Sequence, residues 1–250
     1  GVGFKDCKSA IDETKGDIEK SIVLLRKKGI AKINKRMSRV AAEGLIYVSE
    51  KDNNISLVEI NSETDFVARN KDFINFGKEV SDLSLSKSGK IENLLNSKMK
   101  NNKTVNDNLI DLVSKIGEKI TLRRTAFVSN SETINFSYVH SAIEKNIGKL
   151  GVLVSLKTKK KDDSLLSLGK ELSMHIAAST PLALSKENLD PNIVNKEKEI
   201  IMDELKNSGK DKNIIEKISL GKINKFIMDN TLLNQEWIID PKKKVKDVLK

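Results

Sequence analysis

The sequence of 250 residues contains few aromatic residues, one cysteine, two histidines and three prolines. Aromatic side chains make up only 4% of the chain, so a packed core must be built on Ile, Leu and Val. The single cysteine, Cys7, excludes an internal disulfide and a cysteine-based zinc site, and it favours a reducing compartment. No apolar run approaches the roughly 20 residues that span a bilayer. The chain begins at Gly1 without a signal peptide or an initiator methionine, so we expect a processed or trimmed amino end.

What the sequence has in excess is positive charge. It carries 45 Lys and Arg against 35 Asp and Glu, a formal charge of +10, and its pI is about 9.4. With 38% hydrophobic and 32% charged residues, the composition is that of a globular protein of one large domain or of a few small ones. The charge indicates an acidic partner. Composition does not decide whether that partner is a nucleic acid, an anionic membrane or an acidic protein surface.

The sequence contains no motif of the common enzyme classes. It has neither the phosphate loop Gly-x-x-x-x-Gly-Lys-Ser/Thr nor the dinucleotide motif Gly-x-Gly-x-x-Gly. His140 and His175 are its only imidazole groups, and neither lies in a nucleophile motif. We expect an ordinary structural role for each of them. His175 is predicted to be hydrogen-bonded and half-buried on a mostly apolar helix, and His140 to end a strand.

Two basic patches are the densest in the chain, Lys157–Lys161 and Pro241–Lys246. The second resembles a nuclear-import signal. Binding of single-stranded nucleic acid without sequence preference requires aromatic residues among the charges for base stacking, and neither patch has any. We therefore interpret both patches as solvated loops, with a general attraction to phosphate as the alternative.

The chain begins with two short amphipathic helices, predicted at Phe4–Glu13 and Asp17–Lys28, the second of which is expected to stop at Gly29. So short a pair buries little apolar surface and requires a third helix or a neighbouring domain, which indicates that a preceding segment is missing. We assign residues 1–30 to an amino-terminal helical domain and the basic stretch 31–39 to a linker.

After the linker, the hydrophobic pattern changes from a helical period to a strand period. Val40–Ser49 and Ile55–Asn61 are rich in Val, Ile and Leu and flank the turn sequence Lys51-Asp52-Asn53-Asn54, which predicts a β-hairpin. A polar loop of residues 62–70 follows. Beyond it the pattern predicts three helices and then a strand, at Phe73–Leu83, Ile91–Leu95, Val105–Ile116 and Lys119–Val128.

A second cycle of two strands and a helix follows the first. The strands are predicted at Ile134–Ser141 and Leu150–Lys157, with a turn at 146–148 between them, and the helix at Ser164–Ala178. Leu165–Leu172 repeats the pattern of Phe73–Val80 at a constant offset of 92 residues (165 − 73). We interpret this repeat as an internal duplication, with a chance match as the alternative.

Two charged helices with narrow apolar stripes, Pro191–Asn207 and Asp211–Met228, flank Ser208-Gly209-Lys210 and predict an antiparallel helical hairpin. Because the tail returns to a strand-like Glu236–Ile239 and the start of a helix, the hairpin is interpreted as an insertion. The predicted fold class is α+β, with a small amino-terminal helical domain, two duplicated strand-strand-helix core subdomains and the inserted hairpin. The predicted boundaries are 40–131 for core subdomain N, 132–190 with 233–250 for core subdomain C, and 191–232 for the hairpin.

The unusual local feature is the loop Asn61–Asn70, in which an acidic residue, Asp65, stands beside a large aromatic one, Phe66. One side chain offers a carboxylate that seeks metal ions, and the other offers an apolar wedge. The ordinary interpretation is a helix N-cap at Thr64 or Asp65 with Phe66 packed back on the core. Both interpretations stay open on the residues alone.

These residues belong to a set of motifs that resembles the bacterial translation elongation factors Ts over essentially the whole chain. The motifs are Gly3–Ala10, Gly16–Glu19, Arg39–Ile46, Thr64–Ala68, Tyr138–His140, Gly151–Val154 and Met174–Ala178. Compared with that family, the chain lacks the start of a three-helix, UBA-like amino-terminal domain and stops soon after Val245–Leu249, so the closing element of the core is expected to be absent.

The resemblance implies a guanine nucleotide exchange factor for elongation factor Tu, the GTPase that delivers aminoacyl-tRNA to the ribosome. It implies no catalytic residue and no cofactor, nucleotide or metal of its own. The residues that it implies for insertion near the magnesium site of the GTPase are Thr64, Asp65, Phe66 and Val67, with Asp65 and Phe66 intruding. Further partner contacts are implied at Asp6, Cys7, His140 and His175, and the helical hairpin is either an accessory contact or a surface for homodimer formation.

The resemblance also implies no direct contact with nucleic acid or membrane, and a location in the bacterial cytoplasm rather than in a mitochondrion or plastid. A basic RNA- or ribosome-binding protein is the alternative from another class. An enzyme that uses His140 or His175 is a third. The salt dependence of RNA binding tests the RNA- or ribosome-binding alternative, because phosphate contacts weaken steeply with salt.

Overall fold

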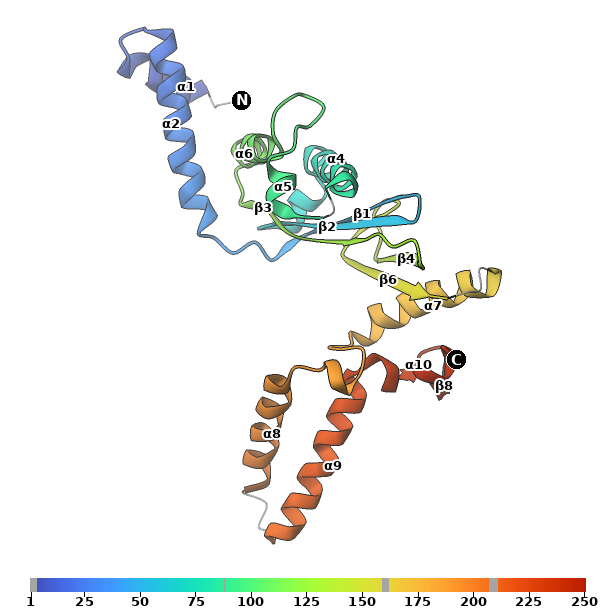
Figure 1. Ribbon diagram of the computed structural model, residues 1–250. Coiled ribbons are helices and arrows are strands. Elements are labelled where there is room, and N and C mark those ends of the chain that lie inside the picture. The colour runs from blue at the N-terminus through green and yellow to red at the C-terminus, as the bar shows by residue number, and fades with distance from the viewer. Residues whose placement is uncertain (1–3, 88, 159–161, 207–210) are drawn as a thin grey trace. The chain divides into compact units, whose positions relative to one another are not determined.

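The computed structural model describes residues 4–87, 89–158, 162–206 and 211–250, and describes only the backbone at residue 26 and at residues 29–37. The protein is a mixed α/β chain (Figure 1) that divides into two compact units, Gly1–Ser173 and Met174–Lys250. The predicted turn Ser208-Gly209-Lys210 and most of the basic patch Lys157–Lys161 lie outside the described residues.

The first unit begins with a helical hairpin of α1 (Phe4–Glu13) and α2 (Ile18–Met37). Ser21 fixes the crossing of the two helices, because its hydroxyl lies 2.5 Å from the Thr14 hydroxyl and donates to the backbone of the turn. Among the hairpin side chains that the structure describes, five large apolar ones are exposed, as expected for so short a pair: Phe4, Ile11, Ile18, Ile22 and Val23.

The predicted helix stop at Gly29 is wrong, because α2 continues through it to Met37. A glycine inside a helix costs only about 1 kcal/mol. The residues around it, Arg26 to Lys28 and Ala31 to Lys32, are strong helix formers that outweigh that cost. Most of the stretch predicted as a linker is therefore helical.

The predicted β-hairpin is confirmed by β1 (Glu43–Lys51) and β2 (Asn54–Ser62), which pair antiparallel from end to end. Asp52 and Asn53 form the two-residue turn with φ values of 50° and 63°, a left-handed geometry that Asp and Asn tolerate well. β3 (Ile120–Val128) pairs with β2, and the short β5 (Ile147–Gly148) pairs with β1, which gives a sheet of order β3-β2-β1-β5.

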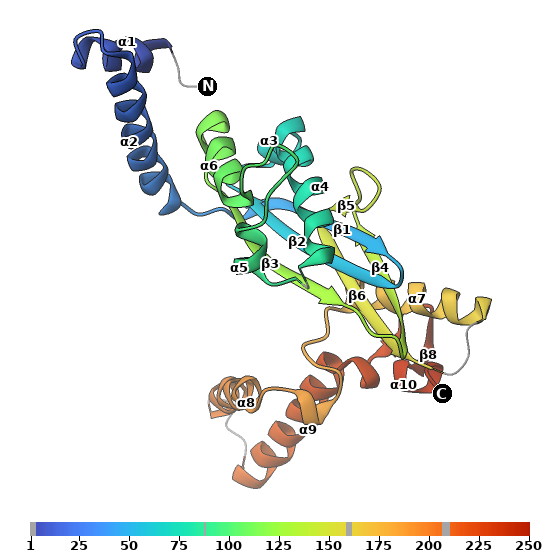
Figure 2. The ribbon, with the colours of Figure 1, turned by 45° about the horizontal axis from the view of Figure 1, so that its top comes forward.

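Helices cover one face of this sheet (Figure 2). They are α3 (Asp65–Ala68), α4 (Lys71–Ser86), α5 (Ile91–Leu95) and α6 (Val105–Ile116). Tyr47 from β1 and Phe73 from α4 lie fully buried at the centre of the core between these layers, with ring centroids 6.4 Å apart. Asn70 caps α4 by accepting from two of its first backbone N–H groups, so α4 begins immediately after α3. The helices predicted at the positions of α4, α5 and α6 are confirmed, whereas α3 lies within the stretch 62–70 predicted as a loop.

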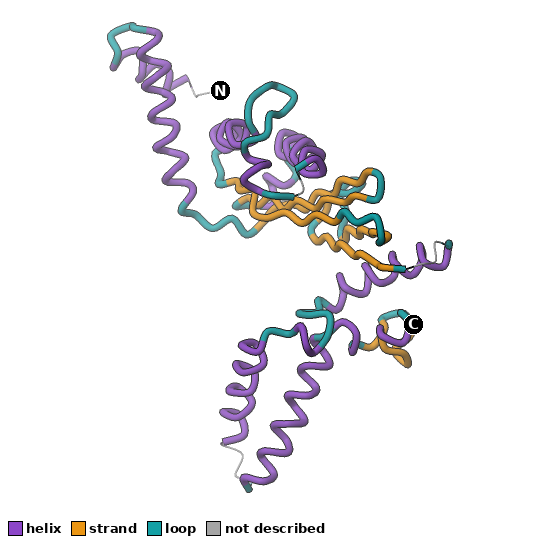
Figure 3. Tube along the Cα trace, viewed as in Figure 1, coloured by secondary structure: helices purple, strands orange, loops and turns teal. Residues whose placement is uncertain are grey.

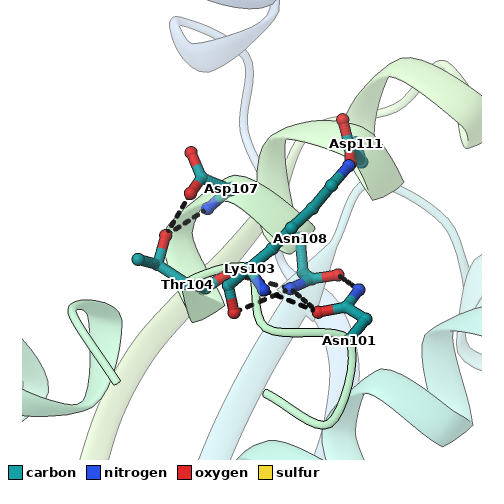
Figure 4. A network of polar contacts seen from close by, with 6 residues as sticks. All are labelled: Asn101, Lys103, Thr104, Asp107, Asn108 and Asp111. Carbon is teal, nitrogen blue, oxygen red and sulfur yellow. Dashed lines mark hydrogen bonds and ion pairs between the residues drawn. The ribbon is translucent and has the colours of Figure 1, made fainter. Parts of the chain in front are cut away.

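The loop between α5 and α6 is held by a network of polar side chains (Figure 4). Thr104 caps α6, since its hydroxyl accepts from the Asp107 N–H at 3.0 Å and donates to the Asp107 carboxylate at 2.7 Å. The Asn108 amide donates to the Thr104 carbonyl at 2.8 Å, and Lys103 pairs with Asp111 at 2.8 Å. The network fixes the start of α6.

A second hairpin, β4 (Thr133–His140) with β6 (Leu150–Lys157), covers the other face of the sheet. Ile46, Val48 and Ile55 form the core between the two layers. α7 (Asp163–Ser179) then lies against β4, where Gly169 leaves no space for a side chain because a Cβ would stand 2.4 Å from the Phe136 ring. Gly77 of α4 meets the Tyr47 ring of β1 in the same way, at 2.0 Å.

Gly77 and Gly169 are equivalent positions of the repeat, because they are 92 residues apart (169 − 77). In each predicted cycle, an aromatic ring of the first strand, Tyr47 or Phe136, packs against the helix at this glycine. This shared packing arrangement supports the predicted duplication, which stays a prediction. The turn predicted at 146–148 contains the short strand β5. Because β5 pairs with β1, it joins the second cycle to the sheet of the first.

The second unit contains the end of α7, the helices α8 (Pro191–Lys206) and α9 (Lys212–Asn230), and a small terminal hairpin. α8 and α9 run antiparallel as two neighbouring helices (Figure 3), linked by an ion pair of 2.6 Å between Glu204 and Lys222. Their exposed apolar residues are Ile200, Ile214, Leu220 and Met228. The predicted helical hairpin is confirmed, and its role in homodimer formation stays a prediction.

The carboxyl-terminal hairpin consists of β7 (Glu236–Trp237) and β8 (Asp240–Lys244), followed by α10 (Val245–Val248). The strand predicted through Ile239 is too long, because Ile238 and Ile239 form the turn between β7 and β8 and are exposed. The basic patch Pro241–Lys246, interpreted as a loop, lies instead in β8 and the start of α10.

Candidate functional site

The short helix α3 divides the predicted Thr64–Val67 site into a buried half and an outward half. Val67 and its neighbour Ala68 pack into the core under the helical layer. Phe66, by contrast, is 79% exposed, and the Asp65 side chain is half-exposed beside it. The ordinary interpretation, in which Phe66 packs back on the core, is therefore wrong. A large aromatic and a carboxylate project together from an anchored turn.

The register of the sheet brings two residues opposite this turn. β2 and β3 end their pairing at Ser62 and Ile120, so continuing the register sets Glu63 opposite Lys119 and Thr64 opposite Glu118. The Glu118 carboxylate accepts from the Thr64 N–H at 3.0 Å and from the Thr64 hydroxyl at 2.8 Å. The ladder is thus extended by a side chain past the last backbone pair.

A second carboxylate repeats this arrangement from the other side. Glu63 accepts from the Lys119 N–H at 2.5 Å and from the Arg39 guanidinium at 3.3 Å, while the Lys119 ammonium donates to the Arg39 carbonyl at 2.7 Å. We call the two reciprocal contacts, Glu118 to Thr64 and Glu63 to Lys119, the carboxylate clamp. The clamp joins the loop that carries Asp65 and Phe66 to the start of β3.

Thr64 occupies the N-cap position of α3, as the ordinary interpretation predicted, but it does not cap the helix with its side chain. Its hydroxyl is directed to Glu118 instead. The N–H groups at the start of α3 therefore lack the side-chain acceptor that an N-cap usually supplies. The residue serves to hold the loop rather than to stabilise four helical residues.

A shallow hollow of about 450 Å³ lies beside α3. Its lining includes the buried apolar residues Leu45 and Ala68, and two ion pairs also line it, Glu43 with Lys149 at 2.6 Å and Asp65 with Arg69 at 3.8 Å. The half-exposed Asp65 carboxylate thus stands next to a concave apolar surface with paired charges.

The other predicted contact residues lie apart from this turn in the chain. Asp6 is exposed and Cys7 is half-buried on α1. His140 is exposed at the end of β4, and its Nδ1 lies 3.0 Å from the Tyr138 hydroxyl. The roles of these three residues in a partner interface stay predictions.

His175 is fully buried, more deeply than predicted, and it is bonded inside the second unit. Gln235 donates through its amide nitrogen to the carbonyls of Ser179 and Asp229, so its oxygen faces the His175 Nε2 at 3.0 Å and accepts from it. The Ile238 N–H donates to Nδ1 at 3.4 Å, and the Trp237 ring stacks on the imidazole at 5.2 Å. Burial lowers the pKa of His175 against the opposing effect of Gln235. A partner-binding role for His175 stays a prediction.

Sequence reasoning identified Thr64 but missed the other three residues of the carboxylate clamp, Glu118, Glu63 and Lys119. The spacing of 54 residues between Thr64 and Glu118 contains no local signal, because their proximity depends on the β2–β3 register. A correct alignment of Asn61 with Thr121 would have been sufficient to find the pair.

The described residues contain no group of three or more His, Cys, Asp or Glu side chains placed to hold a metal ion. Among the helices of the same residues, none is long and apolar enough to cross a membrane.

Comparison with known proteins gives one family. The family model described as "Elongation factor TS" matches residues 63–250, which include the carboxylate clamp and α3. The chain is 43% identical over 251 residues to elongation factor Ts of Parvibaculum lavamentivorans, and the match covers 100% of this chain and 82% of that protein. The proteins of the same name from Bartonella tribocorum and Gluconobacter oxydans are 42% and 38% identical, again over 100% of this chain and 82% of theirs. The chain therefore belongs to the elongation factor Ts family.

Proposed function

We propose that this chain is a guanine nucleotide exchange factor for elongation factor Tu and that it promotes GDP release by disturbing the magnesium site of that GTPase. Family membership supports the role in translation elongation. The mechanism rests on the turn formed by Asp65 and Phe66.

The observation that carries the proposal is the exposure of Phe66 on an anchored turn. Burying a Phe side chain stabilises a protein or a complex by about 1.5 to 3 kcal/mol, and here 79% of the side chain contributes none of that to folding. Val67 in the core and Thr64 on Glu118 hold the turn on both sides of the exposed pair. The exposed apolar surface of Phe66 is therefore available for insertion into a partner.

Asp65 adds a negative charge at the tip of the same turn. Mg²⁺ requires near-ideal octahedral geometry with oxygen ligands at about 2.0 to 2.1 Å, so a small displacement of its surroundings costs much of its binding energy. An apolar wedge and a carboxylate entering beside the metal both disturb that geometry. Once Mg²⁺ leaves, the negative charge of the GDP diphosphate is poorly compensated, and the nucleotide dissociates.

In this scheme, binding of the exchange factor and binding of GDP to the GTPase are thermodynamically coupled, and each weakens the other. If the factor weakens GDP binding by a given free energy, GDP weakens binding of the factor by the same amount. GDP therefore favours dissociation of the complex, while removal of GDP favours a stable complex of this chain with nucleotide-free elongation factor Tu.

Other surfaces are proposed as accessory contacts. The exposed apolar side chains of α1 and α2, next to Asp6 and Cys7, are proposed to bind the nucleotide-binding domain of the GTPase. The second cycle, with His140 and the helix of His175, is proposed to face another domain. The predicted subdomain boundaries and the inserted position of the helical hairpin belong to the same proposal.

The proposal is tested by mixing the chain with elongation factor Tu loaded with fluorescent GDP and following release. The double variant Asp65→Ala with Phe66→Ala is expected to release GDP about ten to one hundred times more slowly at equal concentration, because the insertion free energy of about 1.5 to 3 kcal/mol is lost. The far-UV circular dichroism of this variant should match that of the native chain, since both side chains project from the core.

Val40→Ala is the matched control, because it truncates an apolar side chain of similar exposure in the same unit, on the segment before β1, which is not among the proposed contacts. It is expected to exchange at the native rate. A double variant that exchanges as fast as the native chain contradicts the proposed role of the turn.

The RNA-binding alternative has a separate test. Several lysines of the first unit pair with carboxylates at 2.5 to 2.8 Å, which disperses the positive charge; these are Lys78, Lys103, Lys115, Lys149 and Lys157. We expect labelled RNA to bind weakly at physiological salt. Tight binding that falls steeply between two salt concentrations favours the alternative.

A further inference from the structure

The Glu118 side chain extends the β2–β3 ladder to the loop that carries Asp65 and Phe66. The last backbone pair of the ladder is Ser62 with Ile120. Beyond it, one carboxylate takes both donors of Thr64, the backbone N–H at 3.0 Å and the hydroxyl at 2.8 Å. The carboxylate thereby replaces the backbone acceptor that a further ladder pair would have provided.

The position of Glu118 is determined on both sides by the backbone. Gly117 ends α6 with φ 89°, a left-handed conformation that favours glycine, and its N–H donates to the Val113 carbonyl at 2.9 Å. Ile120, two residues after Glu118, is fully buried as the first residue of β3. Only Glu118 and Lys119 connect these two fixed points, so the Glu118 backbone is held within reach of Thr64.

The hydroxyl of Thr64 has an alternative use in the same loop. At the N-cap position of a helix, a threonine hydroxyl normally accepts from the backbone N–H of the second or third helical residue. Here it donates to Glu118, and α3 has no side-chain cap. Removing Glu118 frees the hydroxyl to turn toward α3, which changes the direction in which Asp65 and Phe66 project.

We propose that Glu118 is a positioning residue that holds the Asp65–Phe66 turn in its inserting conformation before the partner arrives. This inference rests on the proposed exchange function. A turn that is already ordered loses little conformational entropy on docking, whereas a loosened turn must be ordered by the partner. In the docked complex, the native turn and the turn of a variant without Glu118 occupy the same place. Loss of Glu118 therefore raises KM for the GDP-bound partner and leaves kcat unchanged.

The experiment measures kcat and KM for release of fluorescent GDP from elongation factor Tu with the native chain and three variants. Glu118→Ala removes both contacts and is expected to raise KM about tenfold, equivalent to about 1.4 kcal/mol, at constant kcat. Glu118→Gln keeps both contacts, because its oxygen accepts the Thr64 N–H and its amide donates to the Thr64 hydroxyl. It is expected to restore KM to within about threefold of the native value.

Glu79→Ala is the matched control. Glu79 also accepts a backbone N–H, that of Lys100 at 2.5 Å, but it does so at a different loop of the same unit. Its KM is expected to equal the native value. General destabilisation lowers the active fraction and hence the apparent kcat, so the separation of KM from kcat distinguishes a positioning role from a merely structural one.

A second measurement needs no partner. Hydrogen exchange of the Thr64 backbone amide, followed by NMR, is expected to be at least about tenfold faster in Glu118→Ala than in Glu118→Gln. If Glu118→Ala does not fold, Thr64→Val removes the hydroxyl contact alone and is expected to raise KM about threefold.

An unchanged KM in Glu118→Ala, or equal effects of Glu118→Ala and Glu79→Ala, overturns the inference. If the native chain itself fails to release GDP, the proposed function is wrong, and the hydrogen-exchange comparison still decides whether Glu118 orders the turn.

Discussion

Gly77 offers a direct test of how α4 and the site are held on the sheet. A Cβ at this position would stand 2.0, 2.3 and 2.5 Å from three carbons of the Tyr47 ring. The ring has no room to withdraw, because Tyr47 is 1% exposed and its hydroxyl donates to the Phe73 carbonyl at 3.3 Å. The substitution Gly77→Ala must therefore push α4 away from β1.

The expected magnitude follows from two opposing effects. Carbon atoms in contact prefer about 3.5 to 4.0 Å, so the added methyl overlaps three ring carbons by roughly 1 to 2 Å. Overpacking of a core costs about 1 to 3 kcal/mol, and three simultaneous overlaps favour the upper value. Replacing a helical glycine by alanine returns about 1 kcal/mol. We expect Gly77→Ala to lower the free energy of unfolding by about 2 kcal/mol.

The assay is urea unfolding followed by far-UV circular dichroism. Gly221→Ala in α9 is the matched control, since no atom lies within 4 Å of its Cβ, and it is expected to stabilise by about 1 kcal/mol. In a Tyr47→Leu background, which removes the ring, Gly77→Ala should lose its cost. A neutral or stabilising Gly77→Ala in the native background refutes the reasoning. Because α3 directly precedes α4, the destabilised variant should also exchange GDP more slowly.

Two further predictions concern stability. Burial lowers the pKa of His175 below its ordinary value of 6.5, so the unfolded chain takes up the proton first and stability is lost as the pH falls below about 6.5. The difference in unfolding free energy between pH 7.5 and pH 5.5, followed by the fluorescence of Trp237, should be larger for the native chain than for His175→Phe; equal differences refute this assignment. Thr104→Ala removes the cap of α6 and should destabilise the first unit by about 1 kcal/mol in urea unfolding, whereas Thr104→Ser should not; a neutral alanine variant contradicts the capping role.

Much of the secondary structure follows from local patterns in the chain. The turn Asp52-Asn53 between two apolar runs predicts the β1–β2 hairpin, because both residues tolerate positive φ. Errors arise where a local signal is outweighed by its context. Gly29 is an ordinary helix stop, yet strong helix formers on both sides carry α2 through it. Ile238 and Ile239 have strand-like side chains, but the hairpin reverses at that point.

The site was predictable in its residue types and not in its geometry. The adjacency of Asp65 and Phe66 is visible in the sequence, whereas the outward direction of Phe66 depends on Val67 and Ala68 packing inward from α3. The contact of Glu118 with Thr64 depends on the long-range β2–β3 register, which no local pattern specifies. Residues that are close only through sheet pairing require the register before they can be found.

The most direct test of the proposed mechanism is the magnesium dependence of GDP release. We would compare the native chain with the Asp65→Ala, Phe66→Ala double variant, using elongation factor Tu with fluorescent GDP, in millimolar Mg²⁺ and in excess EDTA. If the turn acts on the metal site, the native chain should release GDP much faster than the variant in Mg²⁺, and the two should converge in EDTA, where the metal is already absent. A ratio of the two rates that is the same with and without Mg²⁺ would contradict the mechanism.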